Sequence, residues 1–226
     1  MEFVKEFVTF LHQKEIIKFG DFTLASGKSS SYYVDLRLVP SYPHEFRMMV
    51  KYLEKQITED IGLENFESIV SVPTGGLVIA SALAIETVKP LIYVRSKPKN
   101  YGTSKSVEGK IHDGMKVVMI DDVATTGGSV LNATKSLTEV NVPVKDAYVI
   151  VDRMEGATEA LEELGVKMHS ILNILQIAEV LYEQKLIDVE ILDKVKKQIS
   201  KWVWAAQTNA FQSSISDITL ILHCSQ

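Results

Sequence analysis

The chain has 226 residues and a formal charge of −5, from 24 Lys and Arg against 29 Asp and Glu. At roughly 150 residues per domain, this length predicts one α/β domain, or one with a small addition. The single cysteine, Cys224, excludes a disulfide scaffold and a cysteine-rich zinc site, and the negative charge argues against a protein that coats nucleic acid. No apolar stretch approaches the about 20 residues that cross a bilayer, so we expect a cytoplasmic protein without a membrane partner.

The spacing of apolar residues predicts a helix in residues 3–11 and another in residues 44–59. From residue 68 onward, short apolar runs alternate with segments of helical pattern. The runs cover residues 68–73, 90–94, 116–121, 146–151 and 167–172. Two more helices fit residues 175–184 and 189–200. Strands that alternate with helices in this way predict an α/β fold with a mainly parallel, twisted sheet flanked by helices.

Two segments do not fit this alternation. Residues 96–114, SKPKNYGTSKSVEGKIHDG, show no periodicity, and a loop of that length in a compact domain is commonly a functional lid or a disordered segment. The tail after Trp204 has one strand-like run, ITLIL, which predicts at most an edge strand and indicates no function.

The segment VVMIDDVATTGGS (117–129) joins an apolar strand to a helix that we expect to begin near Gly127. The strand is expected to end at two adjacent acids, Asp121 and Asp122. Ligands of open α/β sheets bind at the carboxyl ends of strands, and the amides of a helix N-terminus suit a phosphate. Carboxylates accept hydrogen bonds from sugar hydroxyls. The segment therefore predicts a ribose 5-phosphate site made by Asp121, Asp122, Val123, Ala124, Thr125, Thr126, Gly127, Gly128 and Ser129.

The alternative is that the two acids only cap the helix and that TTGG is an ordinary turn. For an isolated pair of aspartates this alternative would be preferred, but the complete thirteen-residue unit favours the ribose phosphate site. A second turn of this kind follows the strand at 68–73, where Gly75 and Gly76 precede a helix. Its exposed amides suit an anion. The two glycines could equally serve only to permit a tight turn.

The segment 117–129 resembles the phosphoribosyl-diphosphate motif of type I phosphoribosyltransferases. Further segments follow in the order found in the orotate phosphoribosyltransferase family, and the loop sequence is most similar to that of archaeal members. These segments are FTLASGKSSSYYVDLR (22–37), SVPTGGLVIA (71–80), VRSKPKNYGT (94–103) and IVDRMEG (150–156). The resemblance spans about residues 15–200. It implies a type I phosphoribosyltransferase fold with an N-terminal helix and hood in residues 1–40, a core in 41–204 and a tail of uncertain role in 205–226.

The resemblance implies transfer of the 5-phosphoribosyl group from 5-phospho-α-D-ribose 1-diphosphate (PRPP) to orotate. The products are orotidine 5′-monophosphate and diphosphate, in pyrimidine biosynthesis. Mg²⁺ is expected to be carried mainly by the substrate, and we expect no metal ligands from the protein, because the five histidines have no metal-site spacing. In the family the loop at 94–103 reaches the active site of the other subunit, which implies a homodimer. The catalytic groups implied are Lys99, Asp121 and Asp122.

In the loop, the resemblance assigns contacts with the diphosphate to Arg95 and Lys99. Ser96 and Tyr101 occupy diphosphate-binding positions where many relatives have Lys and His. Ser96 removes a charge for which Lys97 could compensate, and Tyr101 keeps a donor that cannot become cationic. The alternative for a lysine-rich loop is a solvated surface.

Orotate carries a carboxylate, and the planar guanidinium of Arg153 can bind a carboxylate with two hydrogen bonds. By resemblance, Arg153 and Thr125 bind orotate. Lys28 lies in SGKSSSYYVDLR, which we expect to fold as a hairpin over the base, and could reach the ligand's phosphate or carboxylate. Relatives often have a second basic residue where Ser29 stands, so Lys28 could also be only a neighbour of the functional position. The two tyrosines of this segment offer an aromatic wall to the base, or pack in the core.

Two other functions stay open from the sequence. A phosphoribosyltransferase of purine or uracil salvage would share the phosphate motif but would need a different base pocket. A non-catalytic regulator that senses PRPP would be expected to show a basic face or an added helix-turn-helix domain, and would have little use for Lys99.

Overall fold

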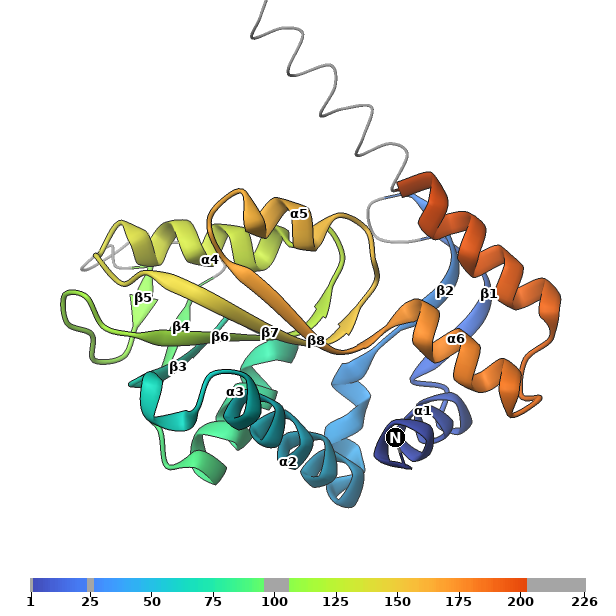
Figure 1. Ribbon diagram of the computed structural model, residues 1–226, viewed down its shortest axis with the longest axis horizontal. Helices are drawn as coiled ribbons and strands as arrows, with labels where there is room; N and C mark the ends of the chain where they lie inside the picture. The colour runs from blue at the N-terminus through green and yellow to red at the C-terminus, as the bar shows by residue number, and fades with distance from the viewer. Residues whose placement is uncertain (1, 24–26, 96–105, 203–226) are drawn as a thin grey trace, which may run out of the picture.

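The computed structural model describes residues 2–23, 27–95 and 106–202 of the chain. Its centre is a six-stranded sheet with the strand order β5-β4-β3-β6-β7-β8 (Figure 1). The strands are β3 (Ser68–Ser71), β4 (Leu91–Val94), β5 (Val107–Glu108), β6 (Val117–Ala124), β7 (Val144–Asp152) and β8 (Lys167–Asn173). All neighbouring strands pair in parallel except β4 and β5, which are antiparallel. The predicted mainly parallel sheet is confirmed, and the short antiparallel edge strand β5 lies in a segment expected to be a loop.

Helices cover both faces of this sheet (Figure 1). One face carries α2 (Pro43–Asp60) and α3 (Gly75–Thr87), and the other carries α4 (Gly128–Thr138) and α5 (Ala157–Glu162). Two 3₁₀ turns, η1 (Leu36–Ser41) and η2 (Leu63–Asn65), flank α2. The parallel strands are therefore joined by crossover helices, as the alternating apolar pattern predicted.

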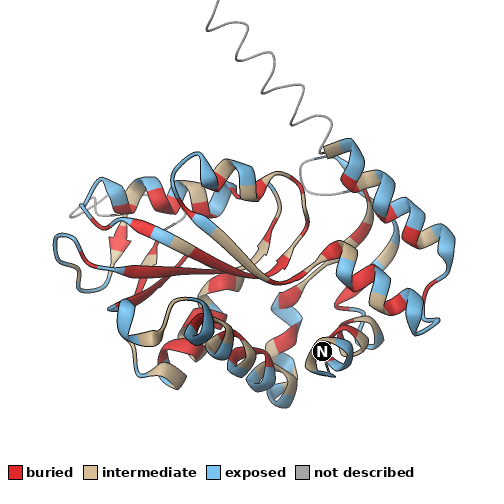
Figure 2. Ribbon diagram, viewed as in Figure 1, coloured by how far each residue is buried: buried red, intermediate tan, exposed pale blue. Residues whose placement is uncertain are grey.

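The central strands are buried on both faces, which explains their continuous apolar sequences (Figure 2). All four residues of β3 are buried, and so are five consecutive residues of β7, 147–151. A strand that is covered on both sides gains no advantage from alternating polar residues. A polar side chain in such a strand therefore needs a specific reason, and β6 contains two acids.

A hairpin stands at one end of the sheet together with three helices (Figure 1). It consists of β1 (Ile17–Thr23) and β2 (Ser29–Val34), and the helices are α1 (Glu2–Gln13), α6 (Ile174–Glu183) and a helix over residues 189–202. One apolar cluster joins these elements to α2, α3 and the sheet, and it includes Leu11, Ile17, Leu53, Ile177 and Val195. The segment SGKSSSYYVDLR was expected to form a hairpin by itself, but it supplies only the second strand, β2, and the first strand, β1, comes from the preceding residues 17–23. The apolar core fixes this hairpin next to the carboxyl ends of the strands.

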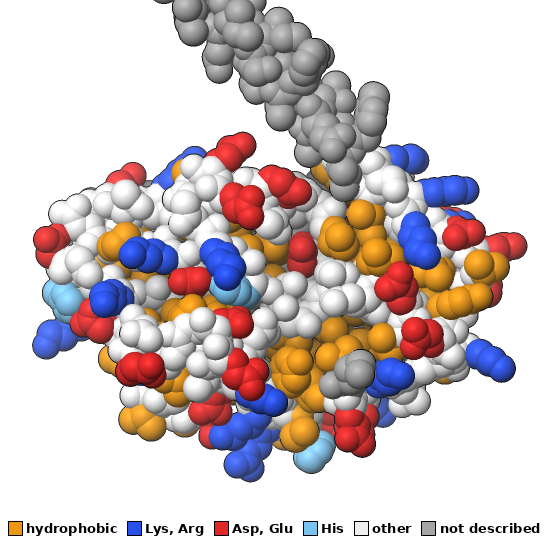
Figure 3. Space-filling view, viewed as in Figure 1, with side chains coloured by type: hydrophobic (Ala, Val, Ile, Leu, Met, Phe, Trp, Pro, Cys, Tyr) orange, Lys and Arg blue, Asp and Glu red, His pale blue; other side chains and the backbone are white. Residues whose placement is uncertain are grey.

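The surface mixes both signs of charge on the face shown in Figure 3, and apolar side chains gather there in the region between α1 and α2. A hollow of about 400 Å³ lies between α1, α2 and α6, with Val4, Tyr52 and Leu172 in its lining. In the described part of the chain, no helix combines the length and the apolar character that a bilayer crossing requires.

Candidate active site at the carboxyl end of β6

Strand β6 lies between β3 and β7 and carries Asp121 and Asp122 near its carboxyl end. We expected the strand to end at these acids, but it continues to Ala124, so both acids lie inside the strand. Asp121 is buried, with 7% of its surface exposed, and Asp122 is half-buried. The Asp122 amide donates to Asp121 Oδ1 over 2.9 Å, and the Val123 amide donates to Asp122 Oδ1 over 2.9 Å. These bonds fix both carboxylates at the end of the sheet.

The two glycines at the start of α3 pack directly against the acid pair. A Cβ atom at Gly75 would overlap the Asp122 carboxylate. One at Gly76 would lie 2.5 Å from Asp121 Oδ1 and 2.8 Å from the Asp121 Cα. Real Cβ atoms do not approach other atoms this closely, so glycine is required here by close packing. The two glycines therefore permit close packing against the acid pair as well as a tight turn, and anion binding by their amides stays a prediction.

Burial, followed by the negative charge of Asp122, raises the pKa of Asp121 from 3.8 to about 8. At neutral pH the free protein therefore keeps a proton on this carboxyl group. A ligand that donates hydrogen bonds to the carboxylate, or brings positive charge near it, would favour the ionised form. We therefore expect ligand binding at Asp121 to release a proton.

The raised pKa of Asp121 predicts a pH-dependent stability. At Asp121 the folded protein binds more protons than the unfolded chain between about pH 4 and about pH 8, so the contribution of this group to the free energy of unfolding falls as the pH rises through this window. In Asp121→Asn this contribution disappears, and the variant gains stability relative to the wild type as the pH rises. Urea unfolding at about pH 5 and about pH 8 measures the difference. Asp193→Asn, at an exposed position, is the control, and an unchanged slope in Asp121→Asn would contradict the assignment.

The turn after β6 leads into α4 through Gly127, which adopts a left-handed conformation with φ of 74°. No side chain caps α4, so the alternative that the two acids cap this helix is wrong. The first amides of an α-helix have no partner within the helix and carry the positive end of its dipole. Thr126 and Ser129 are exposed beside them, and Thr125 is half-buried. This arrangement suits a phosphate group.

Arg153 follows β7, and its amide donates to the Ala124 carbonyl over 2.9 Å, which connects it to the end of β6. Its side chain is buried, with 5% of the residue exposed. Nε and Nη2 donate to Glu155 Oε1 over 3.0 and 2.8 Å, and Nη2 also donates to Ser30 Oγ over 3.2 Å. The guanidinium carbon lies 4.7 Å from the centre of the Tyr32 ring. Arg153 is therefore part of a buried polar cluster at the base of the hairpin.

Tyr32 belongs to the same cluster and is completely buried. Its hydroxyl lies 3.1 Å from the Arg153 carbonyl and 3.1 Å from Glu155 Oε1. Burial, followed by the charge of Glu155, raises the pKa of this hydroxyl. Of the two tyrosines considered for an aromatic wall, Tyr32 is thus a core residue. Tyr33 is half-buried, and its ring lies 5.9 Å from that of Phe22.

Lys28 lies in a cleft of about 710 Å³ between the hairpin and helix 189–202, and its Nζ is 4.2 Å from the Trp202 ring. Among the described residues, the cleft lining includes Ser30, which contacts Arg153, but no residue of 121–129. The structure thus brings Lys28 close to the Arg153 cluster and does not bring it into one cavity with the phosphate turn.

Arg95 directly follows β4, and its Nε donates to Glu108 Oε1 of β5 over 2.6 Å. The side chain keeps 30% of its surface exposed, so it remains accessible to a ligand. Ser96, Lys97, Lys99 and Tyr101 lie outside the described residues.

A metal ion would find few protein ligands here. Within residues 2–23, 27–95 and 106–202, no group of three or more His, Cys, Asp or Glu side chains could bind a metal ion. Asp121 and Asp122 supply carboxylate oxygens of the type that Mg²⁺ prefers, but they would need further ligands from a bound substrate.

The sequence does not predict the groups that surround Arg153. Glu155 is two residues away in the chain, but Ser30 and Gln198 come from distant segments. The Asp-Arg-x-Glu-Gly pattern could have suggested Glu155 as a partner. Ser30 and Gln198 have no signal in the sequence, because only the folded chain brings them together.

Comparison with known proteins identifies similar sequences and folds. The family model for the phosphoribosyl transferase domain matches residues 43–184. The chain is 47% identical over 196 residues to the orotate phosphoribosyltransferase of Cenarchaeum symbiosum, covering 87% of this chain and 98% of that protein. The crystal structure of orotate phosphoribosyltransferase from Aeropyrum pernix is similar with a TM-score of 0.69 and 34% identity, covering 80% of this chain and 99% of that one. Leishmania donovani UMP synthase has a TM-score of 0.75 and 30% identity, covering 88% of this chain and 42% of that one.

Proposed function

Because this chain belongs to the orotate phosphoribosyltransferase family, we propose that the turn after β6 binds the 5-phosphate of PRPP and that Asp121 and Asp122 bind its ribose hydroxyls. The reaction transfers the 5-phosphoribosyl group from PRPP to orotate and gives orotidine 5′-monophosphate and diphosphate, a step of pyrimidine biosynthesis. The observation that carries the site proposal is an uncapped helix N-terminus at Gly127 beside two fixed carboxylates.

The residues of the site have separate tasks in this reaction. The first amides of α4, with Thr126, Gly128 and Ser129, bind the phosphate and so fix the sugar in one position. Positive charge develops on the sugar as the bond to diphosphate breaks, and the acid pair stabilises that charge. This interaction strengthens in the transition state, which is the condition for catalysis.

The leaving diphosphate gains negative charge during the same step. In the proposal, Arg95 and Lys99 bind this diphosphate, with Ser96 and Tyr101 as further donors. Mg²⁺, carried mainly by the diphosphate itself, would neutralise part of the leaving-group charge. In the free protein the Arg95 side chain is hydrogen-bonded to Glu108, and in the proposal the bound diphosphate replaces Glu108 as the acceptor.

In the base site, Arg153 binds the orotate carboxylate, assisted by Thr125 and Lys28. Glu155 and Ser30 accept hydrogen bonds from Nε and Nη2 of Arg153, so this edge of the guanidinium is occupied, and the proposed contact with orotate uses Nη1 rather than the two-bond edge expected from the sequence. Lys28 lies one residue from the hairpin strand that contacts Arg153, and its positive charge attracts the anionic base into the cleft.

An assay of diphosphate release tests the proposed function. With PRPP and Mg²⁺ present, we expect release to depend on orotate, and to cease without Mg²⁺. Release with hypoxanthine or uracil instead of orotate would indicate a salvage enzyme. Binding of PRPP without release in the presence of any of these bases would indicate a regulator and would contradict the enzyme assignment.

We further propose a cytoplasmic homodimer in which α3 contacts a second copy of the chain. Helix α3 is apolar around its circumference, and a helix of this kind is normally buried. Val78 and Ile85 of this helix, and Val88 directly after it, are nevertheless 41%, 81% and 89% exposed. The helix begins at Gly75, against the acid pair, and Val78 follows within one turn, so a second copy that contacts Val78 would lie near the active site. A shared loop between two sites is compatible with that position.

Ile85→Glu is expected to dissociate the dimer, because it introduces a charge into the apolar face. Sedimentation or light scattering at micromolar concentration would then report a monomer, and the rate of diphosphate release would fall because the partner's loop is missing. Leu164→Glu, at an apolar position with 42% exposure on another surface, is the matched control. A dimeric Ile85→Glu protein would show that another surface forms the interface.

A further inference from the structure

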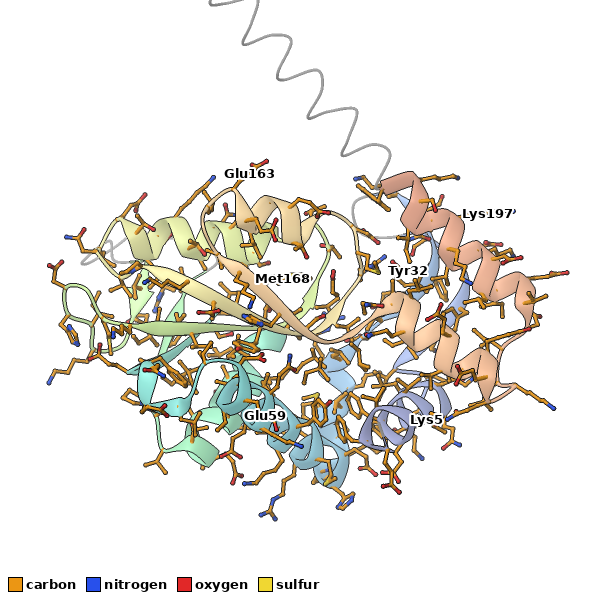
Figure 4. All side chains as sticks on the ribbon, in the orientation of Figure 1. Lys5, Tyr32, Glu59, Glu163, Met168 and Lys197 are labelled. Carbon is orange, nitrogen blue, oxygen red and sulfur yellow. The ribbon has the colours of Figure 1, made fainter. Side chains whose placement is uncertain are left out.

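Gln198 lies on helix 189–202, beyond the residues that the family model matches. The oxygen of its side-chain amide contacts β2. Its Oε1 accepts hydrogen bonds from the Ser31 amide over 2.7 Å and from Ser31 Oγ over 2.9 Å. The backbone of the hairpin is therefore attached directly to this helix. Figure 4 shows Tyr32, the next residue of β2, beside the same helix.

The amide nitrogen of Gln198 contacts the groups that surround Arg153. Its Nε2 donates to Ser30 Oγ over 3.2 Å and lies 3.5 Å from Glu155 Oε1. Ser30 and Glu155 are the two side chains that accept hydrogen bonds from the guanidinium of Arg153. One side chain thus connects the helix, the hairpin and the partners of Arg153.

We infer that Gln198 is a positioning residue for the binding of orotate, and that it acts through Ser30 and Glu155 on Arg153. This inference rests on the proposed role of Arg153 in the base site. A carboxylate bound by a planar guanidinium requires that the guanidinium has one orientation. The ion pair with Glu155 is almost completely buried, with 6% and 5% of the two side chains exposed, so a change in the position of Glu155 moves the guanidinium with it.

The chemistry of the contacts explains why this position requires an amide. A glutamine side chain has an oxygen that accepts and a nitrogen that donates, and Gln198 uses both. A glutamate of nearly the same size keeps the acceptor for Ser31 and loses the donor for Ser30. It also brings a negative charge towards Glu155. Gln198→Glu therefore changes the partners of Arg153 with little change in side-chain volume.

The test compares variants of the full chain in steady-state assays with orotate and PRPP varied separately. For Gln198→Glu we expect the KM for orotate to rise about tenfold, while the KM for PRPP and kcat change less than about threefold. Gln198→Ala, which removes both contacts, is the second variant if Gln198→Glu does not fold, and the same direction is expected. Lys196→Ala, exposed on the same helix, is the control and leaves both KM values unchanged.

The variant Arg153→Lys distinguishes a failure of the proposed base site from a failure of the inference about Gln198. If Arg153→Lys raises the KM for orotate and neither Gln198 variant does, the base site is correct and the inference about Gln198 is wrong. If Arg153→Lys raises the KM for orotate and the KM for PRPP by the same factor, the proposed role of Arg153 in the base site is wrong. A purely structural role of Gln198 would lower Tm and change both KM values together, and this result would also overturn the inference.

Discussion

Gly76→Ala is expected to lower kcat/KM for PRPP by about 100-fold or more. The added methyl group would lie 2.5 Å from Asp121 Oδ1, 2.8 Å from the Asp121 Cα and 2.9 Å from Ser71 Oγ. The carboxylate or the start of α3 must then move, and a displacement of about 1 Å in a catalytic group can cost about 100-fold in rate. Steady-state kinetics with PRPP varied at saturating orotate measures the effect.

The control for this variant adds the same methyl group to a glycine outside the site. Gly165 has φ of 72° and no atom within 4 Å of the position of a Cβ atom. Gly165→Ala is expected to cost about 1 kcal/mol in the free energy of unfolding, because of backbone strain, and to keep the wild-type kcat/KM. If Gly76→Ala also retained wild-type kinetics, the acid pair would not be the group that binds the ribose.

Lys99→Ala is expected to lower kcat by two or more decades while the fold stays intact. The negative charge on the diphosphate grows as the bond to the sugar breaks, so a cation at this point contributes more in the transition state than in the bound substrate. Removing a single group that stabilises such a charge costs about 10²–10³ in kcat in other enzymes. The rate of diphosphate release at saturating substrates is the measurement.

Two further variants define what Lys99 contributes. Lys99→Arg keeps the positive charge and should recover part of the rate. Lys110→Ala removes an exposed lysine from the following segment and should leave kcat unchanged. A near wild-type rate in Lys99→Ala would mean that another cation, of which Lys97 is the nearest candidate, serves the diphosphate.

The sequence predicted the sheet and its crossover helices because both depend on local pattern. Strands buried on both faces give apolar runs such as 147–151, and the helices between them are marked by glycine at their start. The sequence pattern predicts that β6 ends at the two acids, because acids usually mark a strand boundary, but the strand continues to Ala124. Here Asp121 and Asp122 are inside the strand, supported by the amides of 122 and 123. Local polarity alone cannot distinguish a strand end from a functional position within a strand.

The parts of the site that could not be predicted are contacts between distant segments. Arg153 was found as a candidate from its residue type and its place after β7. Its partner Ser30 and the residue Gln198, which contacts Ser30, are 123 and 45 residues away in the chain, so their proximity follows only from the packing of the hairpin and helix 189–202. The pairing of Arg95 with Glu108 was missed for a related reason, because β5 was expected to be part of a loop.

The packing of Gly75 and Gly76 against Asp121 and Asp122 makes two motifs, 45 residues apart in the sequence, into one steric unit. A designer who grafts the phosphate turn onto another α/β scaffold would therefore have to transplant the glycine turn of the neighbouring strand with it. Without that turn, the Cβ atoms of host residues at these two positions would occupy the volume that the carboxylates need.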